Sequence, residues 1–357
     1  MNEEWINRIA LTWGNRTRQR QLRSVLDRYD TATEAASHHP DMLTREAVQH
    51  ARQEMEFIER HHIQCYYYKD DNYPYRLAQC ADAPLLLYAK GSIDVNPKRA
   101  VSIVGTRMPS ERGKEWCRRF VLDLATALPE ISIISGLAYG IDIAAHKAAI
   151  EAGLPTIIIP AHGLDRIYPA VHRTIAVQAL GKGGILTEYT TGTEPERYNF
   201  VARNRIVAGM ADALVVVESK SRGGSLITAQ MAQDYSRDVF ALPGRFNDTI
   251  SEGCNDLIKK QRAQLITSSE DFIQAMQWEQ EHKKAIQTTM VDMLYDLNDK
   301  QRKIIEKLTE SEEGLHVNQL VMELQIPYNE MVAELMMLEL NGIAKGLPGG
   351  LWRRVEQ

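Results

Sequence analysis

The sequence predicts an α/β protein whose central domain is a doubly wound, Rossmann-like parallel sheet flanked by an N-terminal helical domain and a C-terminal winged helix. Between about residues 101 and 275, short and nearly continuous apolar runs alternate with helical segments, and glycine-bearing turns follow the runs. Strands that are apolar on both sides belong to parallel sheets with helices on both faces. The expected strands are Val101–Val104, Ile131–Ile134, Thr156–Ile159, Leu214–Val217 and Val239–Leu242.

Length and composition exclude several classes of protein. The 357 residues suit two or three domains, and 44% hydrophobic with 25% charged residues is ordinary for a globular chain. The longest apolar runs fall far short of the roughly 20 residues that span a bilayer, and the first residues lack the pattern of a signal peptide. Four scattered cysteines form neither a zinc pattern nor a disulfide framework. We therefore expect a cytoplasmic protein without a bound metal.

The N-terminal part, residues 1–65, is expected to be helical. One helix presents an apolar face that includes Leu22 and Leu26, and a second is expected over about residues 44–60. A solvated basic face on a small helical domain and a docking surface for nucleic acid or protein both explain the arginines of this part. These arginines are Arg16, Arg18, Arg20, Arg23 and Arg28.

The C-terminal part has the element order of a winged helix. Apolar residues at helical spacing mark three helices, and a β-hairpin follows them. A winged helix normally reads DNA with its third helix, but that helix, residues 328–340, carries three glutamates and neither Lys nor Arg. The expected boundaries are residues 1–65, 66–276, a linker at 277–297, and 298–357.

Glycine-bearing turns follow four of the expected strands, at Gly105, Gly136, Gly163 and Gly223–Gly224. Glycine allows a ligand to approach the backbone closely, and helix N-termini attract anions. The carboxyl ends of the strands are also where ligands of doubly wound folds bind. Neither a Walker A loop nor G-x-G-x-x-G occurs, so we expect no nucleotide cofactor, and a phosphodiester backbone or a small phosphate fits the turns better.

The segment from Phe200 to Val207 places an aromatic residue beside Arg203 and Arg205. An aromatic ring next to guanidinium groups at an anion site suits stacking on the bases of a single strand. A core phenylalanine with structural arginines is the alternative. Three further basic residues lie on turns at the same edge and favour nucleic acid: Arg107, Lys220 and Arg222.

No residue is expected to be catalytic. Asp142 and His146 lie four residues apart on one helix and could form an oriented general base, but such a pair more often holds the start of a helix. No G-x-S-x-G motif occurs, and the cysteines have no suitable partner.

Taken together, the motifs of the central domain resemble the DprA/Smf family of DNA-processing proteins. The resemblance covers this domain almost without gaps, and it implies that the N-terminal helices form a SAM-like domain and the C-terminal part a winged helix. The matching segments are VGTR from Val104, SGLAYGIDIAAH from Ser135, GLDRIYP from Gly163, RNRIVAG from Arg203, GGSLITA from Gly223, FALPG from Phe240 and GCNDLI from Gly253.

The resemblance implies a non-enzymatic protein of natural transformation. Members of this family bind incoming single-stranded DNA, protect it from nucleases and load RecA recombinase onto it, usually as homodimers. One arginine of the RNR segment would alternatively brace the pocket. The residues expected to bind DNA are Gly105, Arg107, Gly136, Phe200, Arg203, Arg205, Lys220, Gly223, Gly224 and Ser225.

An enzyme is the alternative function. The fold also resembles that of nucleoside-monophosphate phosphoribohydrolases, in which a P-G-G-x-G-T loop runs into a catalytic glutamate. Here the segment from Gly223 offers no carboxylate, and Ala229 lies near the position where one would be expected. This absence counts against hydrolysis.

Overall fold

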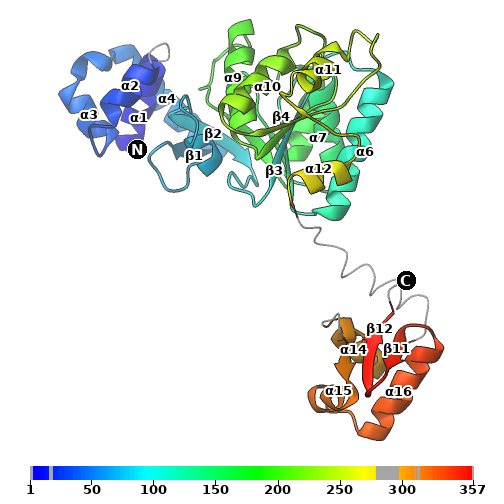
Figure 1. Ribbon diagram of the computed structural model, residues 1–357. Helices are drawn as coiled ribbons and strands as arrows, with labels where there is room; N and C mark the ends of the chain where they lie inside the picture. Colours follow the sequence, from blue (N-terminus) through cyan, green and yellow to red (C-terminus); the bar gives the residue numbers. More distant parts are fainter. Residues whose placement is uncertain (1–2, 16–18, 279–296, 310, 312–313, 356–357) are drawn as a thin grey trace. The chain divides into compact units, whose positions relative to one another are not determined.

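The computed structural model describes residues 3–15, 19–278, 297–309, 311 and 314–355. The chain forms two compact units, Met1–Gln280 and Glu281–Gln357 (Figure 1). Most of the expected linker lies outside the described residues, and the expected domain boundaries stay a prediction. No helix of the described ranges is long and apolar enough to cross a membrane.

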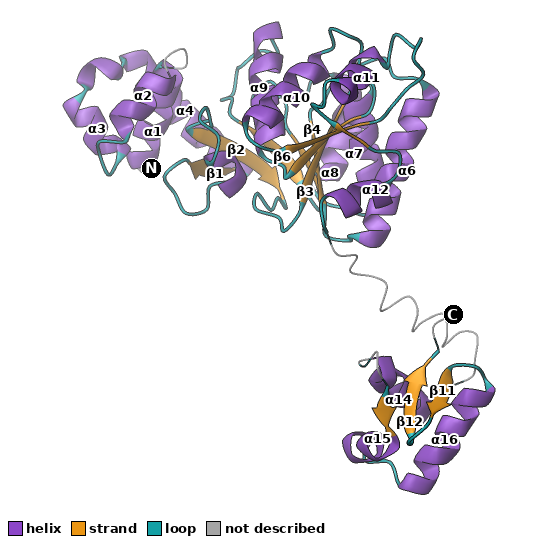
Figure 2. Ribbon diagram, viewed as in Figure 1, coloured by secondary structure: helices purple, strands orange, loops and turns teal. Residues whose placement is uncertain are grey.

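A nine-stranded sheet forms the centre of the first unit (Figure 2). Its spatial order is β1-β2-β6-β5-β4-β3-β7-β8-β9. All neighbours from β6 to β9 in this order are parallel, whereas β1 and β2 add an antiparallel edge. The predicted doubly wound parallel sheet is therefore confirmed. The strands are β1 Gln64–Tyr67, β2 Leu86–Gly91, β3 Ala100–Val104, β4 Ser132–Ser135, β5 Thr156–Ile158, β6 Gly184–Thr187, β7 Ala213–Val216, β8 Asp238–Ala241 and β9 Gln264–Leu265.

Helices cover both faces of the sheet. Ala100 and Val104 of β3 lie in one core with α5, α9, α10 and α11, and Val101 and Ile103 of the same strand lie in another core with α6, α7 and α12. This alternation is the period of two expected for a strand buried on both sides. The helices are α5 Tyr75–Ala78, α6 Glu111–Ala127, α7 Ile141–Glu151, α8 Arg173–Ala179, α9 Arg197–Gly209, α10 Gly224–Asp234, α11 Glu252–Lys259 and α12 Ser269–Ala275.

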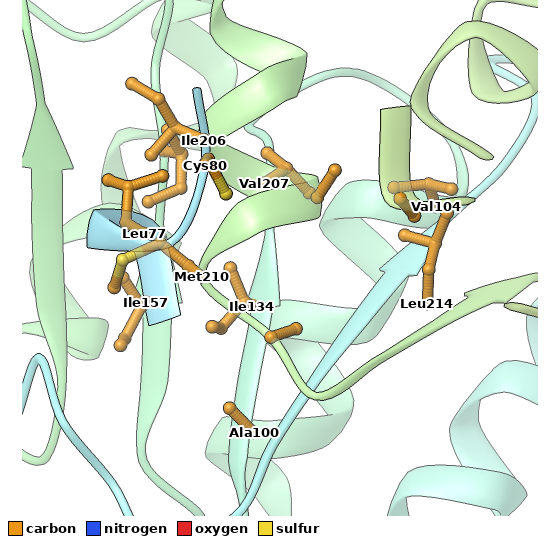
Figure 3. Packing of buried hydrophobic residues seen from close by; sticks show 14 of the residues in the cluster. Leu77, Cys80, Ala100, Val104, Ile134, Ile157, Ile206, Val207, Met210 and Leu214 are labelled. Carbon is orange, nitrogen blue, oxygen red and sulfur yellow. The ribbon is translucent and has the colours of Figure 1, made fainter. Parts of the chain in front are cut away.

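Helix α9 is fixed to the sheet by one apolar face. Ile206, Val207 and Met210 point into a cluster that also contains Leu77 and Cys80 (Figure 3). All five side chains are at most 2% exposed. The other faces of α9 are therefore available for polar contacts, and residues on them contribute to the candidate site described below.

The N-terminal helices are α1 Glu3–Gly14, α2 Gln19–Leu26, α3 Ala32–His38 and α4 Arg45–His61. Leu22 and Leu26 are buried in a core shared with α1 and α3, as their spacing predicted. Thr44 caps α4 by accepting from the backbone N–H of Ala47. The basic side chains are split, because Arg16 and Arg18 lie outside the described residues, Arg20 and Arg28 are exposed, and Arg23 is half-buried. The SAM-like identity of these helices stays a prediction.

The described part of the second unit contains three helices and a three-stranded sheet of order β10-β12-β11. Ile304, Leu320, Leu335 and Leu338 are fully buried in its core. Helices followed by a hairpin confirm the predicted winged-helix order. The elements are α14 Asp299–Thr309, β10 Leu315–His316, α15 Val317–Leu324, α16 Tyr328–Leu340, β11 Ala344–Leu347 and β12 Leu351–Arg354.

Candidate nucleic-acid interface

A pocket of about 310 Å³ lies where the strand order of the sheet reverses. The chain builds β3, β4, β5 and β6 toward one side and then β7, β8 and β9 on the other side of β3. Doubly wound folds bind ligands at the carboxyl ends of the strands beside such a reversal. The lining comes from the turns after β3, β4 and β7 and from α9 and α10.

Nine of the ten residues expected at the site line this one pocket, and Arg205 does not. The turn after β5, which carries Gly163, is also absent from the lining. The nine residues are Gly105, Arg107, Gly136, Phe200, Arg203, Lys220, Gly223, Gly224 and Ser225.

Arg107 and Phe200 lie together at the pocket. The guanidinium carbon of Arg107 is 5.4 Å from the centroid of the Phe200 ring, close enough for a cation–π contact. Arg107 is exposed and Phe200 is half-buried, so Phe200 is not a core residue. Gly140 has φ +85°, and a Cβ at this position would overlap the carbonyl oxygen of Thr106. Only glycine therefore lets α7 start against the turn that carries Arg107.

Arg203 lies at the buried side of the pocket. Its side chain is 3% exposed, and its Nε and Nη1 atoms have no hydrogen-bond partner within the described part of the chain. Asp142 is the nearest counter-charge: a Cβ on Gly136 would meet the Asp142 carboxylate and come within 2.6 Å of Arg203 Nη1. Burial raises the pKa of Asp142, and the Arg203 guanidinium opposes this shift. The Asp142 carboxylate and the Arg203 guanidinium therefore both lie against Gly136 in the turn after β4. The Nε and Nη1 donors of Arg203 stay without a hydrogen-bond partner among the described residues.

Arg205 points to a different side of α9. Its Nη1 and Nη2 atoms each donate to Glu188 at 2.6 Å, and its Nε donates to the carbonyl of Asp82 at 3.0 Å. Positions 203 and 205 are about 200° apart around a helix. Of the two arginines expected to bind DNA, Arg203 lines this pocket and Arg205 does not, which is the geometry of the alternative in which one of them braces the structure.

The N-terminus of α10 opens on the pocket. Gly223 is its N-cap residue, and no side chain caps the helix. Gly224 has open space around the position of a Cβ, and Lys220 and Arg222 are exposed on the same loop. Uncapped N–H groups, the positive end of the helix and two nearby cations all favour an anion.

A buried carboxylate beside this loop is occupied by hydrogen bonds, a feature that the motifs did not reveal. Glu218 is 5% exposed and accepts from the backbone N–H of Ser110 at 2.9 Å and from its hydroxyl at 2.6 Å. The same hydroxyl accepts from the N–H of Gly113 and caps α6. Glu218 therefore anchors α6, and it is not among the residues that line the pocket.

His146 supports the turn after β4 and does not line the pocket. The fully buried ring has Nδ1 2.7 Å from Thr156 Oγ1 and Nε2 2.6 Å from the carbonyl oxygen of Gly136. Burial lowers the pKa of His146 to about 4. The geometry thus favours a helix-start network over a general base. Within the described ranges, no group of three or more His, Cys, Asp or Glu side chains is placed to hold a metal ion.

The fold and the pocket define a doubly wound α/β protein with a crevice at the reversal of its strand order, lined by a buried arginine and the N-terminus of a helix. Residues 64–277 match the family model described as DNA recombination-mediator protein A, and residues 293–350 match the DprA winged helix domain. The first match covers more than half of the chain. The protein therefore belongs to the DNA recombination-mediator protein A family, the DprA/Smf proteins.

Two curated relatives show the extent of this similarity. The DNA processing protein DprA of Streptococcus pneumoniae is 41% identical over 204 residues, which are 57% of this chain and 71% of that protein. Protein Smf of Escherichia coli is 39% identical over 207 residues, which are 58% of this chain and 54% of that protein. The chain therefore spans about half the length of the E. coli relative.

Two solved structures share the fold. DprA from S. pneumoniae superposes with a TM-score of 0.60 at 33% identity, covering 76% of this chain and 92% of that one. DNA processing protein A from Helicobacter pylori, whose structure concerns its single-stranded DNA binding mode, superposes with a TM-score of 0.53 at 30% identity. That match covers 60% of this chain and 95% of that one.

The buried His146 predicts a specific dependence of stability on pH. Its pKa is about 4 in the folded protein against an ordinary value of 6.5. The unfolded chain therefore binds a proton first as the pH falls, and stability that is present above pH 6.5 is lost down to about pH 4. From pH 7 to pH 5, His146 should lower the free energy of unfolding by about 2 kcal/mol.

Urea denaturation of wild type and of His146→Gln at both pH values measures this effect. The variant should lack this part of the decrease, while the contributions of all other titrating groups cancel in the comparison. An equal decrease in both proteins would contradict a neutral, buried His146.

Proposed function

We propose that this protein binds single-stranded DNA in the pocket at the strand reversal and delivers the bound strand to RecA recombinase during natural transformation. The observation that carries the proposal is a single pocket lined by the buried Arg203 guanidinium, the exposed Arg107 and the half-buried Phe200. Charge at the floor and an aromatic ring beside it match the two chemical parts of a nucleotide, its phosphate and its base.

Two N–H donors of the buried Arg203 have no hydrogen-bond partner among the described residues and suit a phosphate. A buried cation with unpaired N–H groups loses several kcal/mol of solvation that a single carboxylate does not fully restore. A phosphate oxygen would accept from Arg203, and further oxygens would face the N-terminus of α10 with Lys220 and Arg222 nearby. The pocket therefore supplies both buried and exposed partners for a phosphodiester.

Phe200 is the residue of the pocket that suits a base. Its half-buried ring lies under the Arg107 guanidinium, and a base could stack there only if it were unpaired, because duplex bases already stack on one another. The similarity to the H. pylori protein, whose single-stranded DNA binding mode has been described, supports the same ligand class. Duplex DNA should therefore bind more weakly than a single strand.

A binding role without turnover is also part of the proposal. Ala229 is fully buried in α10 and does not line the pocket. The two nearby carboxylates are engaged: Asp142 lies against Arg203, and Glu218 accepts from Ser110. No observation on the described residues favours the phosphoribohydrolase alternative.

Substitutions at Arg107 and Phe200 should have separable effects on DNA binding. Arg107→Ala removes a phosphate contact, so it should weaken binding for every sequence and flatten the dependence of affinity on salt, which is about −0.7 per contact for single strands. Phe200→Ala removes a stacking platform worth about 1–3 kcal/mol and should leave the salt dependence nearly unchanged. A salt titration on one labelled oligonucleotide measures both.

Arg118→Ala is the matched control for charge. Arg118 pairs with Glu151 at the C-terminal end of α7, whereas the pocket lies at the N-terminal end of this helix, about 16 Å away along its axis. The control should bind like wild type. If Arg107→Ala and Phe200→Ala also bind like wild type, the pocket is misplaced, and the basic N-terminal helices become the better candidate.

We further propose that the protein is a homodimer that associates through the end of the sheet containing β9. Among the apolar residues of this part of the chain, Leu257 and Ile266 are core residues, at 4% and 0% exposed, whereas Leu265 is 47% exposed on β9. Strand β9 is an edge of the nine-stranded sheet, and exposed edges pair readily with a second chain.

Light scattering at micromolar concentration should give twice the chain mass for wild type and a lower mass for Leu265→Glu, because a charge on this edge opposes its burial. A wild-type monomer at every accessible concentration would end the dimer proposal.

For the winged-helix unit we propose a protein-interaction or regulatory role. Helix α16 is acidic, and its glutamates are engaged: Glu330 with Lys300, Glu334 with Asn298, and Glu339 with the backbone N–H of Gly346. Phosphates would be repelled by such a surface. The basic alternative on this unit is the hairpin strand β12 with its two arginines, Arg353 and Arg354.

Deletion of the chain from Asn298 onward tests this role directly. The shortened protein should keep its affinity for single-stranded DNA within about threefold, or ~0.7 kcal/mol. A hundredfold loss would place part of the DNA site on the winged-helix unit.

A further inference from the structure

We infer that Tyr168 and Tyr139 extend the pocket into an aromatic path along the carboxyl edge of the sheet, on which further unpaired bases of the strand stack beyond Phe200. The inference rests on the proposed function, because it concerns the same strand. It adds binding positions on two turns that do not carry the cationic residues of the pocket.

Tyr168 is the first step of this path. It lies on the turn after β5, is 47% exposed, and its ring meets the ring of Phe200 edge-on at 6.1 Å between centroids. The backbone N–H of Tyr168 donates to Nε2 of the buried His162 at 3.0 Å. This hydrogen bond holds the backbone from which the tyrosine side chain projects. The ring is thus held beside the first stacking platform and remains open to solvent.

Tyr139 flanks the pocket on the turn after β4. It is 51% exposed, and its ring packs edge-on against His172 at 5.0 Å. His172 is itself buried, with Nδ1 3.0 Å from the carbonyl oxygen of Leu137. The next residue, Gly140, lies against the backbone of Thr106 in the turn that carries Arg107. Tyr139 is therefore supported from one side and adjacent to the cationic rim.

The order of the strands places these residues in a line. Strands β5, β4 and β3 are parallel neighbours, and their carboxyl ends carry Tyr168, Tyr139 and Arg107 in this order. Neighbouring strands are about 4.8 Å apart, so the three turns follow one another closely along the edge. Single exposed aromatics are common, but here Phe200 lines the cationic pocket, Tyr168 contacts Phe200, and Tyr139 follows Ala138, which also lines the pocket. Aromatic rings interleaved with cations are what a single strand requires.

The length of the oligonucleotide separates the path from the pocket. Binding of labelled oligothymidylates of increasing length is measured by fluorescence anisotropy. Phe200→Ala should weaken binding at every length. Tyr168→Ala and Tyr139→Ala should leave the shortest bound oligonucleotide within about twofold and weaken longer ones by about 5-fold or more per lost platform. Tyr168→Phe keeps the ring and should bind like wild type.

An abasic site tests whether the tyrosines act on bases. One abasic position is moved along a long oligonucleotide. At one position the affinity of wild type should fall, whereas the affinity of Tyr168→Ala, already lowered by the substitution, should not fall further. Tyr198→Ala is the matched control, because Tyr198 is 78% exposed at the start of α9 and lines a different cavity. Thermal unfolding verifies that each variant is folded.

The outcomes distinguish the two proposals. If both tyrosine variants bind long oligonucleotides like Tyr198→Ala while Phe200→Ala is impaired, the aromatic path is overturned and the pocket stands. If the two tyrosine variants bind long oligonucleotides like Tyr198→Ala but no longer bind a protein partner, the tyrosines belong to the surface for that partner. This result would also overturn the aromatic path. If wild type binds no oligonucleotide, the proposed function itself fails.

Discussion

The absence of a side chain at Gly136 decides where the charged groups at the centre of the site can lie. A Cβ there would collide with the carboxylate of Asp142 and the guanidinium of Arg203. The turn after β4, the start of α7 and the middle of α9 therefore meet at one point. The carbonyl of the same glycine is held by His146, so contacts within the protein itself fix this junction.

A buried and incompletely paired arginine opposes folding, so other contacts must hold it in place. Helix α9 supplies them, because Ile206, Val207 and Met210 lie in the core above the sheet. Arg205 ties the same helix to Glu188. Such an arrangement is typical of binding sites, where a locally unfavourable group is retained and the rest of the fold compensates for its cost in stability. The core thus holds in place a buried cation whose Nε and Nη1 atoms have no hydrogen-bond partner among the described residues.

The sequence predicted the strands that have a strong local pattern of apolar residues. It did not predict the strands that form because a neighbouring strand pairs with them. Runs of β-branched residues marked β3, β4, β5, β7 and β8. The other four strands of this sheet were not predicted: β6 starts at Gly184, β9 has two residues, and β1 and β2 form the antiparallel end of the sheet. Such segments become strands because neighbours offer free N–H and C=O groups, as β2 does to β6 from Tyr88 to Gly91. Sequence periodicity does not contain that information.

By itself, the sequence determined the chemistry available at the site: glycine turns after successive strands and an aromatic residue beside arginines. It also determined that the third helix of the winged-helix unit is acidic. The tertiary structure decided which of these groups meet. Helical spacing separates Arg203 from Arg205 but does not say which one faces the pocket; the packing of α9 on the sheet does. Likewise, Ser110 reaches Glu218 across 108 residues, and Tyr168 reaches Phe200 from another element. Contacts between distant segments depend on the completed core, and no local pattern encodes them.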